Sequence, residues 1–427
     1  MRGLTAAAMA ALMLPGSAIG SEIGDTLAQR LYDGTLSEVR AEAIALCPEH
    51  ADACFAAGLT DLIGGVEALS QAFYRHGGTA PGTPAAAMLL GIDSGTTAMP
   101  LNPDPEPLSY EQLRTILGDF VTAMDAAKGY FEQGDGSEFV IAIEPLRVRI
   151  DLDGNGVAEA EETLAAVVGA VGEFANIPSP DAPPVSDKTR SKRAEAAAPD
   201  LSIGFDNADS IWFAGYTQVV AAPVDLLLAH DFSEFFDAYL HRVFPVAGLL
   251  MQNYSRGSRL MMDPESDAFI ADIIAAIHTI DFPVTDAERL AGVLERLKAI
   301  TALSRQNWEL ILAESDDDRE LVPSPRQTSL LPETPVTEQT VAAWLATLDT
   351  MDQIFAGELL VPHWRFEQGF DLSAYFATAS ETDLVMLIAG QGALPYLRPG
   401  PIADARSFAE ANEAFGTDWL RYAFWFN

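Results

Sequence analysis

The residues whose spacing points most directly to chemistry lie in one stretch of twelve, from Asp151 to Glu162. Oxygen-bearing side chains recur at alternate positions at its start, at Asp151, Asp153 and Asn155, and Glu159 and Glu162 follow. Hard divalent cations such as Ca²⁺ take about six to eight oxygen ligands from carboxylates, amides and backbone carbonyls. The spacing therefore predicts a calcium site.

The stretch resembles the calcium-binding loop of EF-hand proteins, over twelve of the 427 residues. Gly156 stands where the family needs a sharp reversal of the chain, and Glu162 stands where it has a bidentate carboxylate. The resemblance implies six ligands, with Glu159 binding directly or through water and the fourth ligand being a backbone carbonyl: Asp151, Asp153, Asn155, Val157, Glu159 and Glu162.

Two features depart from the family. Ala158 replaces the usual bulky aliphatic residue, and no second loop of this kind occurs in the sequence. The approach from Leu146 to Ile150 alternates apolar residues with arginines, a period of two that predicts a strand, whereas residues 164–171 have helical spacing. We expect a single structural strand-loop-helix calcium site, and the competing interpretation is a polar turn that binds no ion.

A second metal site is an alternative hypothesis for the C-terminal half. Its candidate ligands follow His230 and are spaced to lie along one side of a helix: Asp231, Glu234, Asp237 and His241. Mixed histidine and carboxylate ligands suit zinc, iron or manganese, and an open position would make the site catalytic. This hypothesis is a metal-dependent hydrolase that uses Asp237, His241 and His363. Because the H-E-x-x-H motif is absent, an acidic helix face in water is the simpler interpretation.

Only two cysteines are present, Cys47 and Cys54, and both lie in one short segment. In an oxidising compartment such a pair is expected to form a disulfide. His50 lies between them, so a metal or redox pair is the alternative, although neither C-x-x-C nor a four-ligand zinc spacing occurs.

Composition limits the class of protein. A length of 427 residues exceeds the usual size of a single core and predicts two or more domains. An apolar content of 49% is enough to fill their cores. The net charge of −37 is unfavourable for binding nucleic acid or anionic lipid. No nucleophile-elbow, phosphate-loop or dinucleotide-binding motif is found, which disfavours common hydrolase, NTPase and NAD chemistries. An unidentified protein partner is compatible with this composition.

The N-terminus predicts export. Arg2 is followed by an uncharged apolar stretch from Leu4 to Leu14, and small residues end at Gly20, as in a secretory signal peptide. We expect cleavage after Gly20 and a periplasmic or secreted mature protein. No later apolar run reads as a transmembrane segment.

The periodicity predicts a mainly α fold, with helices across residues 22–76, a helix from Ser37 to Leu46, and a capping box at Ser109 and Gln112. The first helices resemble a tetratricopeptide-type pair. We expect an N-terminal domain at 21–175, a flexible linker at 176–203, and a C-terminal domain at 204–427. Short apolar runs at 359–366, 369–372 and 384–388 predict a small β region.

Two further expectations concern the C-terminal half. Trp308 is predicted at the edge of a buried helix face, and the acidic run from Glu314 to Glu320 is predicted to fray into water, with a second calcium ion as the alternative. Several blocks resemble a family of exported bacterial proteins, which implies export and an intact C-terminus but no activity: residues 205–230, 308–327, 362–366, 393–396 and 425–427.

Overall fold

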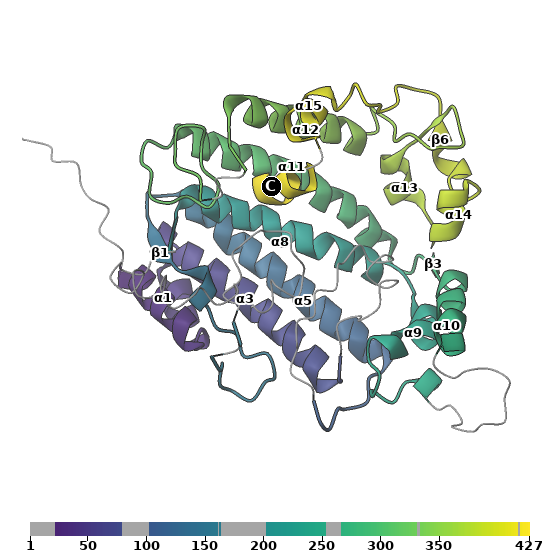
Figure 1. Ribbon diagram of the computed structural model, residues 1–427, viewed down its shortest axis with the longest axis horizontal. Coiled ribbons are helices and arrows are strands. Elements are labelled where there is room, and N and C mark those ends of the chain that lie inside the picture. Colours follow the sequence, from purple (N-terminus) through teal and green to yellow (C-terminus); the bar gives the residue numbers. More distant parts are fainter. Residues whose placement is uncertain are drawn as a thin grey trace, which may run out of the picture.

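The computed structural model describes residues 22–78, 102–160, 162–163, 202–252, 266–330, 334–416 and 419–427. The fold is mainly helical (Figure 1). The helices of the first half are α1 (Glu22–Asp33), α2 (Ser37–Leu46), α3 (Ala51–Arg75) and α5 (Tyr110–Phe131). Those of the second half are α8 (Asn207–Leu228), α9 (Ser233–Tyr239), α10 (Ser266–His278), α11 (Ala287–Ala313), α12 (Glu338–Phe355), α13 (Leu372–Thr378), α14 (Leu384–Ala389), α15 (Ala409–Phe415) and α16 (Trp419–Phe426).

The described strands are short and form three antiparallel pairs. These are β1 (Ile141–Ile143) with β2 (Ile203–Phe205), β3 (Asp281–Pro283) with β5 (Glu381–Asp383), and β4 (Gly369–Phe370) with β6 (Leu397–Arg398). Each pair joins two strands that are separated in the sequence by at least one helix. The strand pairs therefore connect different groups of helices.

Four long helices, α3, α5, α8 and α11, lie side by side as the centre of the molecule (Figure 1). Their starts follow from local sequence. Ser109 and Gln112 form the predicted capping box of α5, and Asp206 caps α8 by accepting hydrogen bonds from the backbone N–H groups of Ala208 and Asp209. Asp286 caps α11 in the same way.

The halves on either side of the predicted linker share a core. Phe55 of α3 and Phe131 of α5 pack with Phe205 and Phe213 from the second half. The pair β1–β2 also crosses this division. The domain division stays a prediction, and residues 176–201 of the linker lie outside the described residues.

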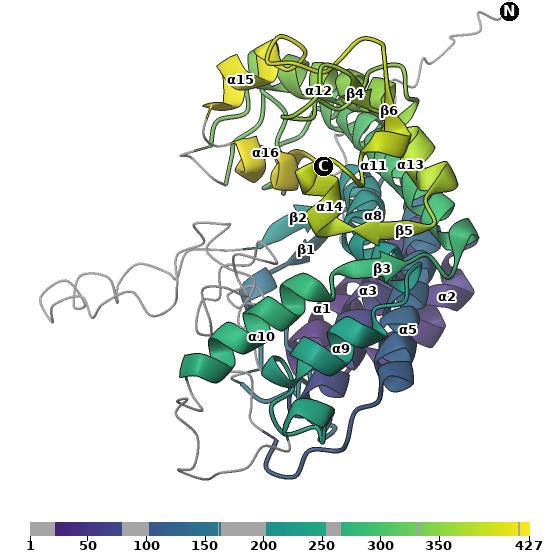
Figure 2. The same ribbon diagram turned by 90° about the vertical axis from the view of Figure 1, so that its right-hand side faces the viewer.

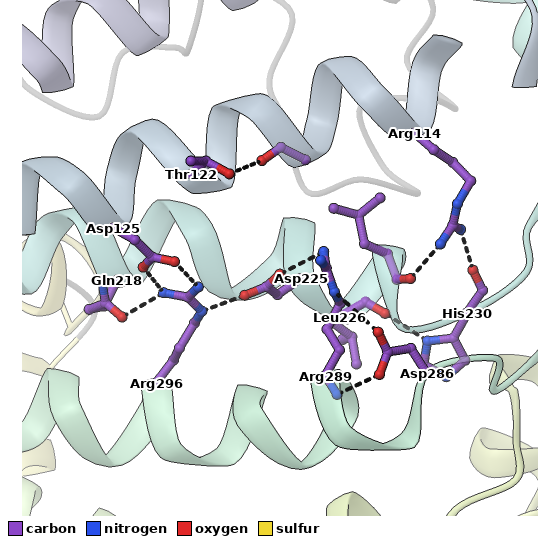
Figure 3. Close-up of polar contacts among 12 residues, drawn as sticks. Arg114, Thr122, Asp125, Gln218, Asp225, Leu226, His230, Asp286, Arg289 and Arg296 are labelled. Carbon is purple, nitrogen blue, oxygen red and sulfur yellow. Dashed lines mark hydrogen bonds and ion pairs between the residues drawn. The ribbon is translucent and has the colours of Figure 1, made fainter. Parts of the chain in front are cut away.

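A chain of charges connects the central helices (Figure 3). Arg296 of α11 forms a two-pronged ion pair with Asp125 of α5, at 2.5 and 2.7 Å. Its Nε also donates to Asp225 of α8 at 2.5 Å, and Asp225 accepts from Arg289 at 3.1 Å. Asp225 is buried, and an unpaired carboxylate in that position would be unfavourable. The two arginines balance its charge. A groove of about 750 Å³ runs along these residues between α5 and α11.

Cys47 and Cys54 form a disulfide with a Cα–Cα distance of 4.3 Å. It closes the turn between α2 and α3, and the helix from Ser37 to Leu46 has the predicted bounds. These two local predictions are confirmed.

Three local predictions are wrong. Leu146 belongs to a 3₁₀ turn (Pro145–Arg147), and of the predicted strand only Arg149 makes a bridge, to Thr163. Residues 384–388 lie in helix α14, because Asp383 caps the backbone N–H of Met386. Trp308 is fully buried and its Nε1 donates to the carbonyl of Phe426 at 3.1 Å, a partner more than a hundred residues away.

Helices α3 and α8 are long and apolar enough, by length and composition, to cross a membrane. Half or more of the relevant window of each, 61% and 50%, is buried inside the protein, as in the core helices of globular folds. Their apolar composition is therefore accounted for by packing against the other central helices.

Candidate metal centre

The predicted calcium loop folds around its first and last carboxylates. Asp151 accepts hydrogen bonds from the backbone N–H groups of Gly154 at 2.7 Å and Gly156 at 2.9 Å. Both glycines have positive φ, 75° and 87°, which glycine adopts without strain. Glu162 accepts from the backbone N–H of Leu152 at its Oε1 and of Glu159 at its Oε2, each at 3.0 Å. The loop therefore closes on itself at positions one and twelve.

Three carboxylates converge inside this loop. Asp151, Asp153 and Glu162 each offer an oxygen, and these oxygens lie within 4.8 Å of one another. Asp151 and Glu162 are 7% and 8% exposed, so their charges are largely removed from water. Burial raises the pKa of Glu162 to about 7, and the neighbouring Glu159 acts in the same direction. A divalent cation would favour the ionised form of each carboxyl group.

The other predicted ligands lie on the exposed side of the loop. Asn155 accepts from the backbone N–H of Val157 at 2.8 Å and donates to Glu159 at 3.1 Å. Hydrogen bonding to Glu162 and to Asn155 lowers the pKa of Glu159. The Val157 side chain is exposed, consistent with a position that would contribute only its backbone carbonyl. The side-chain oxygens of Asn155 and Glu159 are thus held close to the loop but are not in the inner carboxylate group.

Two side chains of helix α3 form hydrogen bonds with the backbone of the loop, a contact that was not predicted from the sequence. Glu67 accepts from the backbone N–H of Asp151, and Gln71 donates to the backbone carbonyl of the same residue, both at 2.9 Å. Burial raises the pKa of Glu67. Residues spaced by four on a helix share one face, so Glu67 and Gln71 point the same way. Asp151 lies 84 residues after Glu67 and 80 residues after Gln71, and no local sequence pattern predicts that they meet.

The structure also explains the unusual Ala158. It is buried against the turn between α1 and α2, where Gly34 has a φ of 69°. A Cβ added at Gly34 would come within 2.4 Å of the Ala158 Cβ. A bulky aliphatic side chain at position 158 would collide with this turn. The α1–α2 turn therefore packs against this position of the loop.

The helix that was expected to follow the loop falls on residues 164–171, which lie outside the described residues. Within the described part, Arg149 and Thr163 form a bridge, and the backbone N–H of Ile150 donates to the carbonyl of Glu162 at 3.0 Å. The two ends of the loop are therefore held together.

The residues of the alternative metal hypothesis have separate partners. His230 contacts the carbonyl of Leu226 and the hydroxyl of Thr382, whereas His241 pairs with Asp272 of α10 at 3.0 Å. His363 contacts the carbonyl of Leu387. Glu234 and Asp237 are exposed to solvent. Among the described residues, no group of three metal-ligand side chains with atoms within 4.8 Å includes these positions.

A second carboxylate cluster lies where the acidic run was expected to fray. Asp206, Glu314 and Glu320 bring oxygens within 4.8 Å of one another at the start of α8, and Glu320 is only 5% exposed. Arg319 has a positive φ of 68° and donates through Nε to the carbonyl of Ser202, at 2.6 Å. In the part of the chain that the structure describes, no ion pair involves these three carboxylates. The prediction of fraying is wrong for the two ends of the run, because Glu314 and Glu320 lie beside Asp206 at the start of α8, whereas residues 315–318 are exposed to solvent.

The pKa values in this cluster are raised. Burial raises the pKa of Glu314 to about 8, with Asp206 acting in the same direction, and burial raises the pKa of Glu320 to about 7. Burial and the charge of Asp206 also raise the pKa of Asp209 well above its ordinary value. The proximity of Asp206 and Asp209 to a run more than a hundred residues later could not be read from the sequence.

We expect the protein to lose stability as the pH rises from about 5 to about 8. Glu314 and Glu320 have ordinary pKa values of 4.5, so the unfolded chain releases these protons first and the folded state binds more of them in this range. Partial exposure limits the loss to on the order of 2 kcal/mol. Urea unfolding at pH 5.5 and 8.0, with chelator present, measures it.

Glu314→Gln with Glu320→Gln should reduce this pH dependence without abolishing it, because the raised pKa values of Glu162 and Asp209 act in the same direction and remain. Glu49→Gln, at an exposed position, should leave it unchanged. The lowered pKa of His230 acts in the opposite direction and is common to all variants. Equal pH slopes in the double variant and the parent protein would show that the cluster does not control the effect.

Comparisons with known proteins add no family to this description. No family model, curated protein or solved structure matches the chain.

Proposed function

We propose that the protein is an exported calcium-binding protein in which one Ca²⁺ has a structural role. The observation that carries this proposal is the convergence of Asp151, Asp153 and Glu162 within a loop closed by backbone N–H groups. All three offer the hard oxygen ligands that Ca²⁺ prefers. Three buried or half-buried carboxylates in such proximity repel one another, and a divalent ion would reverse the sign of that interaction.

The surroundings support a structural role. The loop contacts α3 through Glu67 and Gln71, and it contacts the α1–α2 turn through Ala158 and Gly34. An ion at the loop would stabilise these contacts together. In this proposal the tetratricopeptide-like α2–α3 pair acts as a rigid support for the loop. Export is inferred from residues 1–20, which lie outside the described residues, and it would place the site in a calcium-containing medium.

Calorimetric titration with CaCl₂ tests the proposal directly. Protein stripped with chelator, at pH 8, should bind about one ion per chain, and Asp151→Ala should abolish the heat of binding. Asp151 holds the N–H groups of Gly154 and Gly156, so this variant removes both a ligand and the closure of the loop. A flat trace for the parent protein at millimolar calcium would refute the proposal.

A further inference from the structure

Exposed apolar side chains gather on one side of the molecule. Helix α10 presents Ile270, Ile274 and Ile277 at helical spacing, with 56%, 51% and 44% of each residue exposed. Helix α14 presents Val385 and Ile388, and the latter is 70% exposed. Figure 2 shows α10, the β3–β5 pair and α14 on the side turned toward the viewer.

Hydrogen bonds to the backbone hold these segments next to one another. The backbone N–H of Leu384, at the start of α14, donates to the carbonyl of Ile280 just after α10, at 3.0 Å. At the other end of α14, Nε1 of Trp364 donates to the carbonyl of Ile388 at 2.8 Å. Trp364 is 72% exposed and Arg365 stacks over its ring at 4.7 Å. Large exposed apolar side chains gathered on one face are a feature of interaction sites.

An acidic strip lies between the two apolar helices. Strand register places Asp281 of β3 directly opposite Asp383 of β5, and Glu381 lies at the other end of the same pair. Like charges directly opposite in a strand pair are unfavourable. Within the described residues, no ion pair involves Asp281, Glu381 or Asp383. A cation from outside would relieve this repulsion.

We propose that this surface, which we call the α10–α14 face, binds an amphipathic protein segment whose apolar side chains flank Lys or Arg residues. The apolar stripes of α10 and α14 would receive the apolar side chains, and Asp281 and Asp383 would pair with the basic ones. Charge complementarity decides this choice. A second copy of the chain would bring a net charge of −37 against the same acidic strip, and an anionic lipid surface would be repelled for the same reason.

A synthetic 18-residue helical peptide of Leu and Lys, with one apolar face, serves as the probe. We expect the fluorescence anisotropy of the labelled peptide to rise on binding. Acrylamide quenching of the fluorescence that Trp364→Phe removes from the six-tryptophan protein should be reduced in the complex. Ile274→Gln with Ile388→Gln should weaken binding at least tenfold, because Gln is compatible with a helix but removes apolar surface. Leu46→Gln with Leu312→Gln is the matched control at exposed positions elsewhere, and its affinity should equal that of the parent protein.

The charge requirement has its own test. Asp281→Asn with Asp383→Asn should weaken binding and reduce its salt dependence, and Asn at position 383 can still cap α14. A Leu and Glu peptide of the same pattern should bind at least tenfold more weakly than the Leu and Lys peptide. Three results would overturn the proposal: equal affinity for the Ile274 and Ile388 double variant, protection of Trp364 by phosphatidylcholine vesicles without peptide, or its protection by self-association in sedimentation.

Discussion

Millimolar calcium should raise the melting temperature of the chelator-treated protein by on the order of 5 °C at pH 8. An ion that binds only the folded state stabilises it by about 2.7 kcal/mol at a concentration one hundred times its dissociation constant. The expected gain is large because the loop fastens α3 and the α1–α2 turn at once, through Glu67 and Ala158. Differential scanning calorimetry with calcium and with chelator measures the shift.

Glu162→Gln should remove this calcium effect with little change in the shape of the loop. The side-chain oxygen of Gln can still accept one of the two backbone hydrogen bonds that Glu162 accepts, from Leu152 and Glu159, but the bidentate charge is lost. Glu49→Gln changes the net charge by the same amount at an exposed position and should keep the full shift. If Glu162→Gln kept the full shift as well, the ion would have to bind elsewhere.

Asp225→Ala should lower the free energy of unfolding by about 3 kcal/mol. Asp225 is buried between Arg289 and Arg296, so its removal takes the buried carboxylate partner from both guanidinium groups. Breaking a buried ion pair on one side typically costs about 3–5 kcal/mol, and the lower value is expected here because Arg296 keeps its pair with Asp125. Urea unfolding followed by circular dichroism measures the loss.

Asp125→Ala is the matched control for this prediction, since it removes a carboxylate from the same chain of charges at an exposed position (Figure 3). Exposed ion pairs contribute about 0–1 kcal/mol, so its effect should be small. Equal losses in Asp225→Ala and Asp125→Ala would mean that burial does not set the strength of these pairs.

Features encoded by neighbouring residues were predictable. The turn from Asp151 to Glu162 closes within twelve consecutive residues, and the disulfide joins cysteines seven apart. Ser109 and Asp206 cap helices through N–H groups two or three residues away. Each of these requires only a local conformation, which residue type and spacing strongly favour. The mainly helical class followed from the same periodicity.

Features that depend on distant partners were not predictable in this way. Three such features join segments that are tens of residues or more than a hundred residues apart. They are the hydrogen bond from Asp151 to Glu67, the close approach of Gly34 to Ala158, and the cluster of Asp206 with Glu314. The ends of the acidic run, Glu314 and Glu320, lie beside Asp206 at the start of α8, and the carbonyl of Arg319 accepts from the backbone N–H of Gly204 in β2. Trp308 is buried and bonds to the carbonyl of Phe426 in the C-terminal segment. A single sequence specifies which residues bond to their neighbours along the chain, whereas the folding of the chain brings remote side chains into contact and thereby sets their burial and their pKa values.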